Sequence, residues 1–188
     1  MAVRCGESSE SRSFRRSVNL PCRKALFFVE GDAMAAKLIF DGRAHQISLV
    51  GSDGASMGTW PAYNNVDSHA TLTHLQNRSY TVEDRTTPHR HLANANGPYG
   101  FHGIIRFNVP GHPGIGVHSG RANARHMPGP AHPTMGCIRT TDEAMQAIVV
   151  AMRGAPVVTV EVTNNSAPMA RAASHRNRHR QLHGRHHG

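Results

Sequence analysis

The sequence predicts a mainly β domain with one helix, because short alternating apolar segments recur between turn residues and only one stretch has helical spacing. Of 188 residues, 38% are hydrophobic and 5% aromatic, and 18 are Gly and 11 Pro. This composition is typical of a turn-rich globular protein and not of a helical bundle or a disordered chain. The length suits one domain with tails.

A clean strand pattern begins directly after Met34, where residues 37–40 and 44–50 alternate around an Asp41-Gly42 turn signal. Two alternating segments around such a turn predict a β-hairpin. Further strands are expected at residues 57–63, interrupted by Pro61, and at residues 79–83, 99–109 and 115–118.

The one helix is expected after Cys137. Residues 140–143, Thr-Thr-Asp-Glu, form a capping box, and residues 144–152 carry apolar side chains at helical spacing. Gly154 and Pro156 end this helix, and residues 157–162 form the last strand. Residues 88–98 are rich in His, Asn and Ala without periodicity, which predicts a loop.

We therefore expect the folded domain to span residues 34–163. Residues 1–33 show neither strand nor helix periodicity and are predicted to be a disordered extension, with Met34 a candidate for the natural start. Residues 164–188 are predicted to be a disordered tail, since residues 168–188 contain five Arg, five His and no acid.

The net charge of +9 is unevenly distributed. Residues 34–167 hold ten Lys or Arg and eight Asp or Glu, so the tail supplies more than half of the excess. A folded region with so small an excess, and without aromatic residues interleaved with basic ones, argues against nucleic-acid binding.

The chain has three cysteines, Cys5, Cys22 and Cys137, which build neither a disulfide framework nor a paired-cysteine zinc site. No apolar run approaches the roughly 18 residues that span a membrane. Residues 1–16 are polar and lack the apolar core of a signal peptide, so no general export route is recognised in this sequence.

Two short segments carry the candidate chemistry. Gly-Val-His-Ser-Gly at residues 116–120 places His118 at a strand end, and Thr-Met-Gly-Cys-Ile-Arg at residues 134–139 contains Cys137. A cysteine attacks a carbonyl as the thiolate and needs a base such as His within reach. Taken singly, Cys137 is more typical of a buried apolar residue and His118 of a structural histidine.

The residues around Cys137 add to this hypothesis. Gly136 lets a substrate approach the backbone closely, and the N–H groups of Met135, Gly136 and Cys137 are candidates for an oxyanion site. Arg139 is a candidate for lowering the pKa of the thiol or for binding a substrate carboxylate, and otherwise for a surface salt bridge.

Together these segments resemble the L,D-transpeptidase catalytic domain, also called YkuD. The matching positions are His118, Ser119, Thr134, Gly136, Cys137, Ile138 and Arg139, while Met135 stands where some members have His. Agreement is good over residues 99–150 and weaker back to residue 37. In residues 75–82 the Pro and Gly of the family's Thr-Pro-x-Gly-x-Tyr strand are missing.

The resemblance implies a β-sandwich or barrel with one helix after the catalytic cysteine, and a cysteine-dependent acyltransferase without a cofactor. Cys137 would attack a peptidoglycan stem peptide, release D-alanine, and pass the acyl group from a thioester to an amine. His118 would be the base and Ser119 would orient its ring. Gly136, Met135, Arg139 and Thr134 would form the oxyanion and substrate-binding part of the site.

The resemblance also implies action on the bacterial cell wall, in the periplasm or outside the cell, as part of cell-wall biogenesis. Three alternatives stay open. In the first, water is the acceptor and the enzyme is a hydrolase, an L,D-carboxypeptidase or endopeptidase. Such a hydrolase could also be an antibacterial effector that is delivered to neighbouring cells. A non-catalytic wall-binding module is the second. A metal-binding protein is suggested by 15 His, but no zinc motif supports it and no metal ligands are assigned. The oligomeric state is not predicted.

Overall fold

The computed structural model describes residues 35–166. The expectations for residues 1–33, for Met34 and for the tail beyond residue 166 lie outside the described residues. Within them, the mainly β class with one helix after Cys137 is confirmed.

Eight strands, one α-helix and one 3-10 turn follow one another along the described chain. They are β1 (Ala36–Asp41), β2 (Gln46–Val50), β3 (Ser56–Tyr63), β4 (Arg78–Thr81), β5 (Ile104–Arg106), β6 (Gly116–His118), η1 (Gly129–Ala131), β7 (Ile138–Thr140), α1 (Asp142–Met152) and β8 (Val157–Thr163).

The strands form one curled sheet in the order β4-β8-β1-β2-β3-β7-β6-β5. The pairs β1–β8 and β6–β7 are parallel, and the other neighbours are antiparallel. The two end strands also meet, because Val82 after β4 bridges Phe107 after β5. The Glu83 N–H donates to the Arg106 oxygen at 2.9 Å, and the Asn108 N–H donates to the Thr81 oxygen at 2.9 Å. The sheet therefore closes into a barrel.

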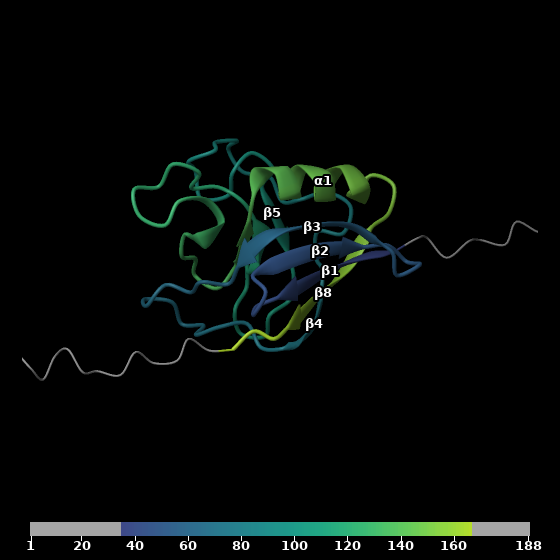
Figure 1. The fold of residues 1–188 in the computed structure, drawn as a ribbon, viewed down its shortest axis with the longest axis horizontal. Coiled ribbons are helices and arrows are strands. Elements are labelled where there is room, and N and C mark those ends of the chain that lie inside the picture. The colour runs from purple at the N-terminus through teal and green to yellow at the C-terminus, as the bar shows by residue number, and fades with distance from the viewer. Residues whose placement is uncertain (1–34, 167–188) are drawn as a thin grey trace, which may run out of the picture. The chain divides into compact units, whose positions relative to one another are not determined.

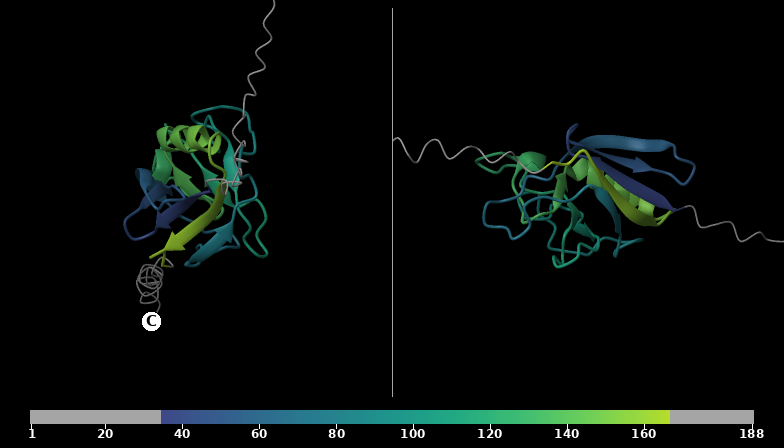
Figure 2. Two further views of the ribbon diagram at one scale, coloured as in Figure 1. Left: turned by 90° about the vertical axis from the view of Figure 1, so that its right-hand side faces the viewer. Right: turned by 90° about the horizontal axis from the view of Figure 1, so that it is seen from below.

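Helix α1 lies along one side of the curled sheet (Figure 1), and the strands β1 and β8 lie in front of it when the molecule is seen from below (Figure 2). The Thr141 hydroxyl caps the helix by accepting the Ala144 N–H at 3.1 Å, so the cap lies within the predicted signal at residues 140–143. The helix buries Met145, Ile148 and Met152 in the same core as the strands.

The strand predictions differ from the structure in three places. Strand β7 (Ile138–Thr140) lies where the sequence pattern predicts no strand. The predicted interruption at Pro61 is wrong, because β3 runs through it. Its partner changes there, since Pro61 is the last residue opposite β2 and Ala62 the first opposite β7. The predicted strand 99–109 is reduced to β5, since Gly100 and Gly103 have φ angles of 68° and 77° that break the extended chain.

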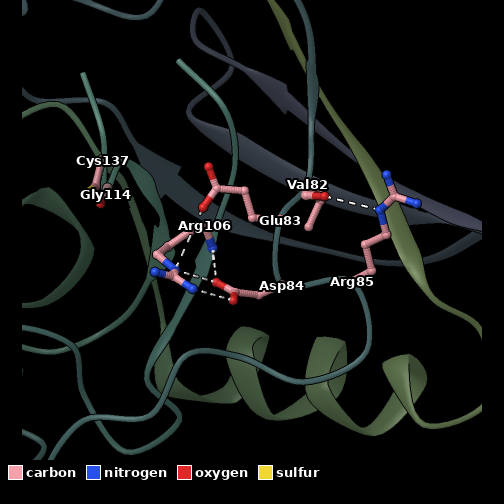
Figure 3. A network of polar contacts seen from close by, with 7 residues as sticks. All are labelled: Val82, Glu83, Asp84, Arg85, Arg106, Gly114 and Cys137. Atoms are coloured by element: carbon pink, nitrogen blue, oxygen red, sulfur yellow. Dashed lines mark hydrogen bonds and ion pairs between the residues drawn. The ribbon is translucent and has the colours of Figure 1, made fainter. Parts of the chain in front are cut away.

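An ion pair reinforces the line where the barrel closes, here called the seam. Arg106, at the end of β5, donates from Nε and Nη2 to the two carboxylate oxygens of Asp84 at 2.8 Å each (Figure 3). The Arg106 N–H donates to the same carboxylate at 2.8 Å, and Glu83 lies at 4.0 Å from the guanidinium. Burial alone would raise the pKa of Asp84, but the Arg106 hydrogen bonds and charge outweigh it and lower that pKa.

We expect Asp84→Asn to lower the free energy of unfolding by about 2 kcal/mol, since three N–H donors of Arg106 lose a charged acceptor. Urea unfolding at neutral pH measures this. Glu83→Gln is the control and should change stability by less than about 0.5 kcal/mol, because Glu83 only borders the ion pair. Equal losses in the two variants would contradict the role given to the Asp84–Arg106 pair.

Candidate active site

The parallel pairing of β6 with β7 brings the two motif segments together. Val117 lies opposite Ile138, and His118 lies opposite Arg139. Side chains alternate along a strand, so Cys137, one residue before β7, shares a sheet face with Arg139 and with His118. The connection of 19 residues between β6 and β7 therefore ends with the thiol diagonally beside the imidazole.

Cys137 is 7% exposed and lies at the wall of a cavity. Its Sγ is 3.9 Å from the Gly114 oxygen, and both residues are labelled in Figure 3. Burial raises the pKa of the thiol, while a backbone hydrogen bond from Gly116 and the Arg139 charge oppose that rise. Burial is the largest of these effects, so the thiol is protonated at neutral pH.

His118 is buried, and its Nδ1 is 2.8 Å from the Ser119 carbonyl oxygen. A carbonyl can only accept, so Nδ1 carries the proton and Nε2 is left as the basic nitrogen. Burial, followed by the Arg139 charge, lowers the pKa of His118 to about 3. The imidazole is therefore neutral at neutral pH.

The resting pair is thus a neutral thiol beside a neutral imidazole. Among residues 35–166 no hydrogen bond joins the Cys137 Sγ to the His118 ring. Neither charged form of this pair is favoured, so an attack by this thiol on a carbonyl would require transfer of its proton to Nε2.

Arg139 is a buried cation, 4% exposed. Its Nη1 donates to the Ser119 oxygen at 2.9 Å and to the Pro98 oxygen at 3.0 Å, and its Nε donates to the His132 oxygen at 3.2 Å. Burial lowers the pKa of Arg139 to about 10, so the guanidinium stays charged at neutral pH. It is not the surface salt bridge considered from the sequence, because it has no carboxylate within 4.0 Å among the described residues.

Ser119 is fully buried and connects the base to the start of α1. Its hydroxyl donates to the Asp142 carboxylate, which also accepts the Phe101 N–H at 3.2 Å. Ser119 reaches His118 through its carbonyl oxygen and not through this hydroxyl. Sequence reasoning missed Asp142 as a site residue, because its acidic side chain was explained by the helix cap.

The turn before Cys137 is stabilised by hydrogen bonds between its own residues. The Thr134 hydroxyl donates to the Cys137 oxygen at 2.8 Å and accepts the Gly136 N–H at 3.2 Å. Gly136 has φ 128°, and a Cβ there would lie 2.7 Å from Leu72, so glycine is required. Because the Gly136 N–H is engaged, any oxyanion donor from this turn falls to the N–H groups of Met135 and Cys137.

Asn64 supports the same turn from the end of β3. Its Nδ2 donates to the Gly136 oxygen at 2.8 Å and to the Cys137 oxygen at 3.2 Å, while its Oδ1 accepts from Leu75 and Asn165. Nothing in the local sequence marks this residue, because the turn that it supports lies more than 70 positions downstream.

The candidate site surrounds a cavity of about 210 Å³. The predicted residues Cys137, His118, Arg139, Thr134 and Met135 line it, whereas Ser119 and Gly136 lie behind the wall. Sequence reasoning missed the six other lining residues, which are Asp67, Pro98, Tyr99, Arg121, His132 and Pro133. The Tyr99 ring stands edge-on to His118, with centroids 5.1 Å apart.

Residues 35–166 contain no group of three or more His, Cys, Asp or Glu side chains placed to hold a metal ion. The tail histidines lie outside this range. In the same part of the chain, no helix combines the length and apolar character needed to cross a membrane.

No protein-family model matches the sequence, and neither does any curated protein. Among solved structures, the chain is similar to L,D-transpeptidase 1 of Mycobacterium tuberculosis, with 18% identity over 69% of this chain and 62% of that one, at a TM-score of 0.44. It is also similar to the L,D-transpeptidase of Stackebrandtia nassauensis, with 14% identity, 70% and 58% coverage and a TM-score of 0.46. The chain is likewise similar to an L,D-transpeptidase of Mycobacterium smegmatis, with 19% identity over 69% of this chain and 59% of that one, at a TM-score of 0.42.

The chain thus spans about three fifths of the length of these structures. The roles of the site residues rest on the geometry of this chain.

The neutral state of His118 predicts a pH dependence of stability. Between pH 6.5 and about 3 the unfolded chain binds a proton at this residue that the folded chain does not, so stability falls as the pH falls. The contribution is about 1.4 kcal/mol per pH unit. Urea unfolding at pH 6 and pH 4.5 should show a smaller loss in His118→Gln than in the wild type, whereas exposed His126→Gln should match the wild type.

Proposed function

We propose that this chain is a cysteine-dependent acyltransferase of the L,D-transpeptidase type that acts on peptidoglycan stem peptides in the bacterial cell wall. The observation that carries the proposal is the pairing of β6 with β7, which sets Cys137 and His118 at one cavity. The sequence motifs around both residues and the buried Arg139 support the same chemistry.

In the first half of the proposed reaction, the Cys137 Sγ attacks the carbonyl carbon of a stem peptide. Its proton passes to Nε2 of His118, because Nδ1 is already bound to the Ser119 carbonyl. The carbonyl oxygen becomes an oxyanion, for which the N–H groups of Met135 and Cys137 are the proposed donors. When the C–N bond breaks, D-alanine leaves with the proton from His118, and a thioester remains on Cys137.

In the second half, an amine attacks the thioester, transfers a proton to Nε2, and forms the new amide. The thiolate leaving group takes this proton back, which restores the neutral pair. Arg139 holds the Ser119 and Pro98 carbonyls in place and adds a positive charge that favours both the thiolate and the oxyanion.

Water can take the place of the amine in the second half, which would make the enzyme an L,D-carboxypeptidase or endopeptidase. The two outcomes differ in product: transfer joins two stem peptides, whereas hydrolysis shortens one.

Incubation with a carbapenem tests the nucleophile, because the strained β-lactam carbonyl acylates an active thiol and leaves the whole compound attached. We expect one adduct, located at Cys137 by peptide mass spectrometry. Cys5→Ala and Cys22→Ala, the matched controls, should keep it, and Cys137→Ala should lose it. An adduct that survives Cys137→Ala would refute the assignment.

His118→Gln should slow this acylation by about 100-fold or more, since the base is lost. The rate is measured from the growth of the adduct mass at pH 7.5, and circular dichroism checks that the fold is kept. His69→Gln, at an exposed position, serves as the control with an unchanged rate. Equal rates for His118→Gln and the wild type would remove His118 from the mechanism.

A stem tetrapeptide that ends in D-alanine then tests the substrate. Release of D-alanine together with a crosslinked dimer indicates transfer, and release with the tripeptide alone indicates hydrolysis. Acylation by the carbapenem without any release from the tetrapeptide would reject peptidoglycan stems as the substrate while retaining the nucleophile.

A further inference from the structure

The segment that builds the candidate site contains no acidic residue. Between Asp84 and Asp142 the sequence has no Asp or Glu, yet residues 85–141 include six Arg and seven His. Every residue that lines the Cys137 cavity comes from this segment except Asp67. Such an excess of one charge along a cleft attracts ligands of the opposite sign.

Most of this positive charge is not neutralised within the fold. Arg106 is paired with Asp84 at the seam, as Figure 3 shows. By contrast, Arg121, Arg125 and Arg139 have no carboxylate within 4.0 Å among residues 35–166. Of these three, Arg121 and Arg139 line the Cys137 cavity.

A second cavity of about 390 Å³ adjoins the Cys137 cavity, with which it shares Arg121 and His132. No Asp or Glu of the described part of the chain lines it. The polar residues on its wall are Asn96, Arg121, Asn123, Arg125, His126 and His132. Guanidinium, imidazole and carboxamide groups without a carboxylate suit an anionic ligand that accepts hydrogen bonds.

The loop that carries these side chains is held in one conformation. Arg121 has φ 58°, a left-handed conformation that few non-glycine residues adopt. Its carbonyl oxygen accepts the Gly129 N–H at 2.7 Å and the Ala124 N–H at 3.1 Å, and the Asn96 side chain accepts the Asn123 N–H at 3.0 Å. A preorganised loop binds its ligand without first having to become ordered.

The charges of the two cavities also act on each other. After burial, the nearby Arg121 charge is the next largest cause that lowers the pKa of Arg139. Two like charges around adjoining cavities repel, and an anion bound between or beside them relieves this repulsion.

We propose that the cavity next to Cys137, walled by Arg121, Arg125 and His132, is a subsite for a carboxylate of the acyl donor away from the scissile bond. The inference rests on the proposed function, because it takes the donor to be a stem peptide with internal carboxylates. Arg121 and His132 connect the subsite to the thiol, so the ligand spans both cavities. Arg125, which lines the second cavity but not the Cys137 cavity, binds the internal carboxylate.

Two stem tetrapeptides test the subsite: one has free internal carboxylates and the other has primary amides there, while both keep a free terminal carboxylate. The measurement is protection of Cys137 against iodoacetamide, followed by peptide mass spectrometry, which needs no turnover. In the wild type the free acid should protect at a concentration about 10-fold lower than the amide.

Arg125→Gln should remove this preference, so that both peptides protect at the same concentration, and Arg125→Lys should keep part of it. Arg153→Gln, at the exposed end of α1, is the matched control and should keep all of it. Equal protection by both peptides in the wild type, or an unchanged preference in Arg125→Gln, would overturn the proposal. So would protection by an oligonucleotide but by neither peptide.

The two proposals fail separately. If no carbapenem adduct forms on Cys137 but the free acid still protects better than the amide in an Arg125-dependent way, the carboxylate subsite stands and the acyltransferase does not. If the adduct forms and the two peptides protect Cys137 equally, the acyltransferase proposal is retained and the carboxylate subsite is rejected.

Discussion

The parallel pairing of β6 with β7 is the contact on which the candidate site depends. Parallel neighbours cannot be joined by a tight turn, so the chain needs a long connection between them. That connection, residues 119–137, supplies Arg121, His132 and the turn before Cys137. One pairing therefore sets the thiol beside the imidazole and also provides the chain that walls both cavities.

Burial gives the site its electrostatic character. It raises the pKa of the Cys137 thiol and lowers that of His118, so both groups are neutral before a substrate arrives. It also strips water from Arg139, whose guanidinium donates its hydrogen bonds among the described residues to main-chain carbonyl oxygens. A buried cation of this kind costs stability, and such features are commonly retained where they act on a ligand or reaction.

The sequence predicts those features that local pattern controls. The hairpin of β1 and β2, the cap at Thr141, and the position of His118 at the end of a strand all follow from spacing and residue type. Prediction from sequence fails where contacts between residues far apart in the chain determine the structure. Asn64 and Asp142 hold the site through partners far along the chain, and the shortened β5 depends on two positive-φ glycines that a strand-like composition conceals.

Closure of the barrel at Val82 and Phe107 has a consequence for how the protein behaves in solution. An open sheet presents two rows of unpaired N–H and C=O groups, which can recruit strands from other molecules. Here the terminal strands β4 and β5 face one another, and the Arg106–Asp84 ion pair holds them together. Weakening that ion pair would free both edges at once and favour self-association through added β-strands.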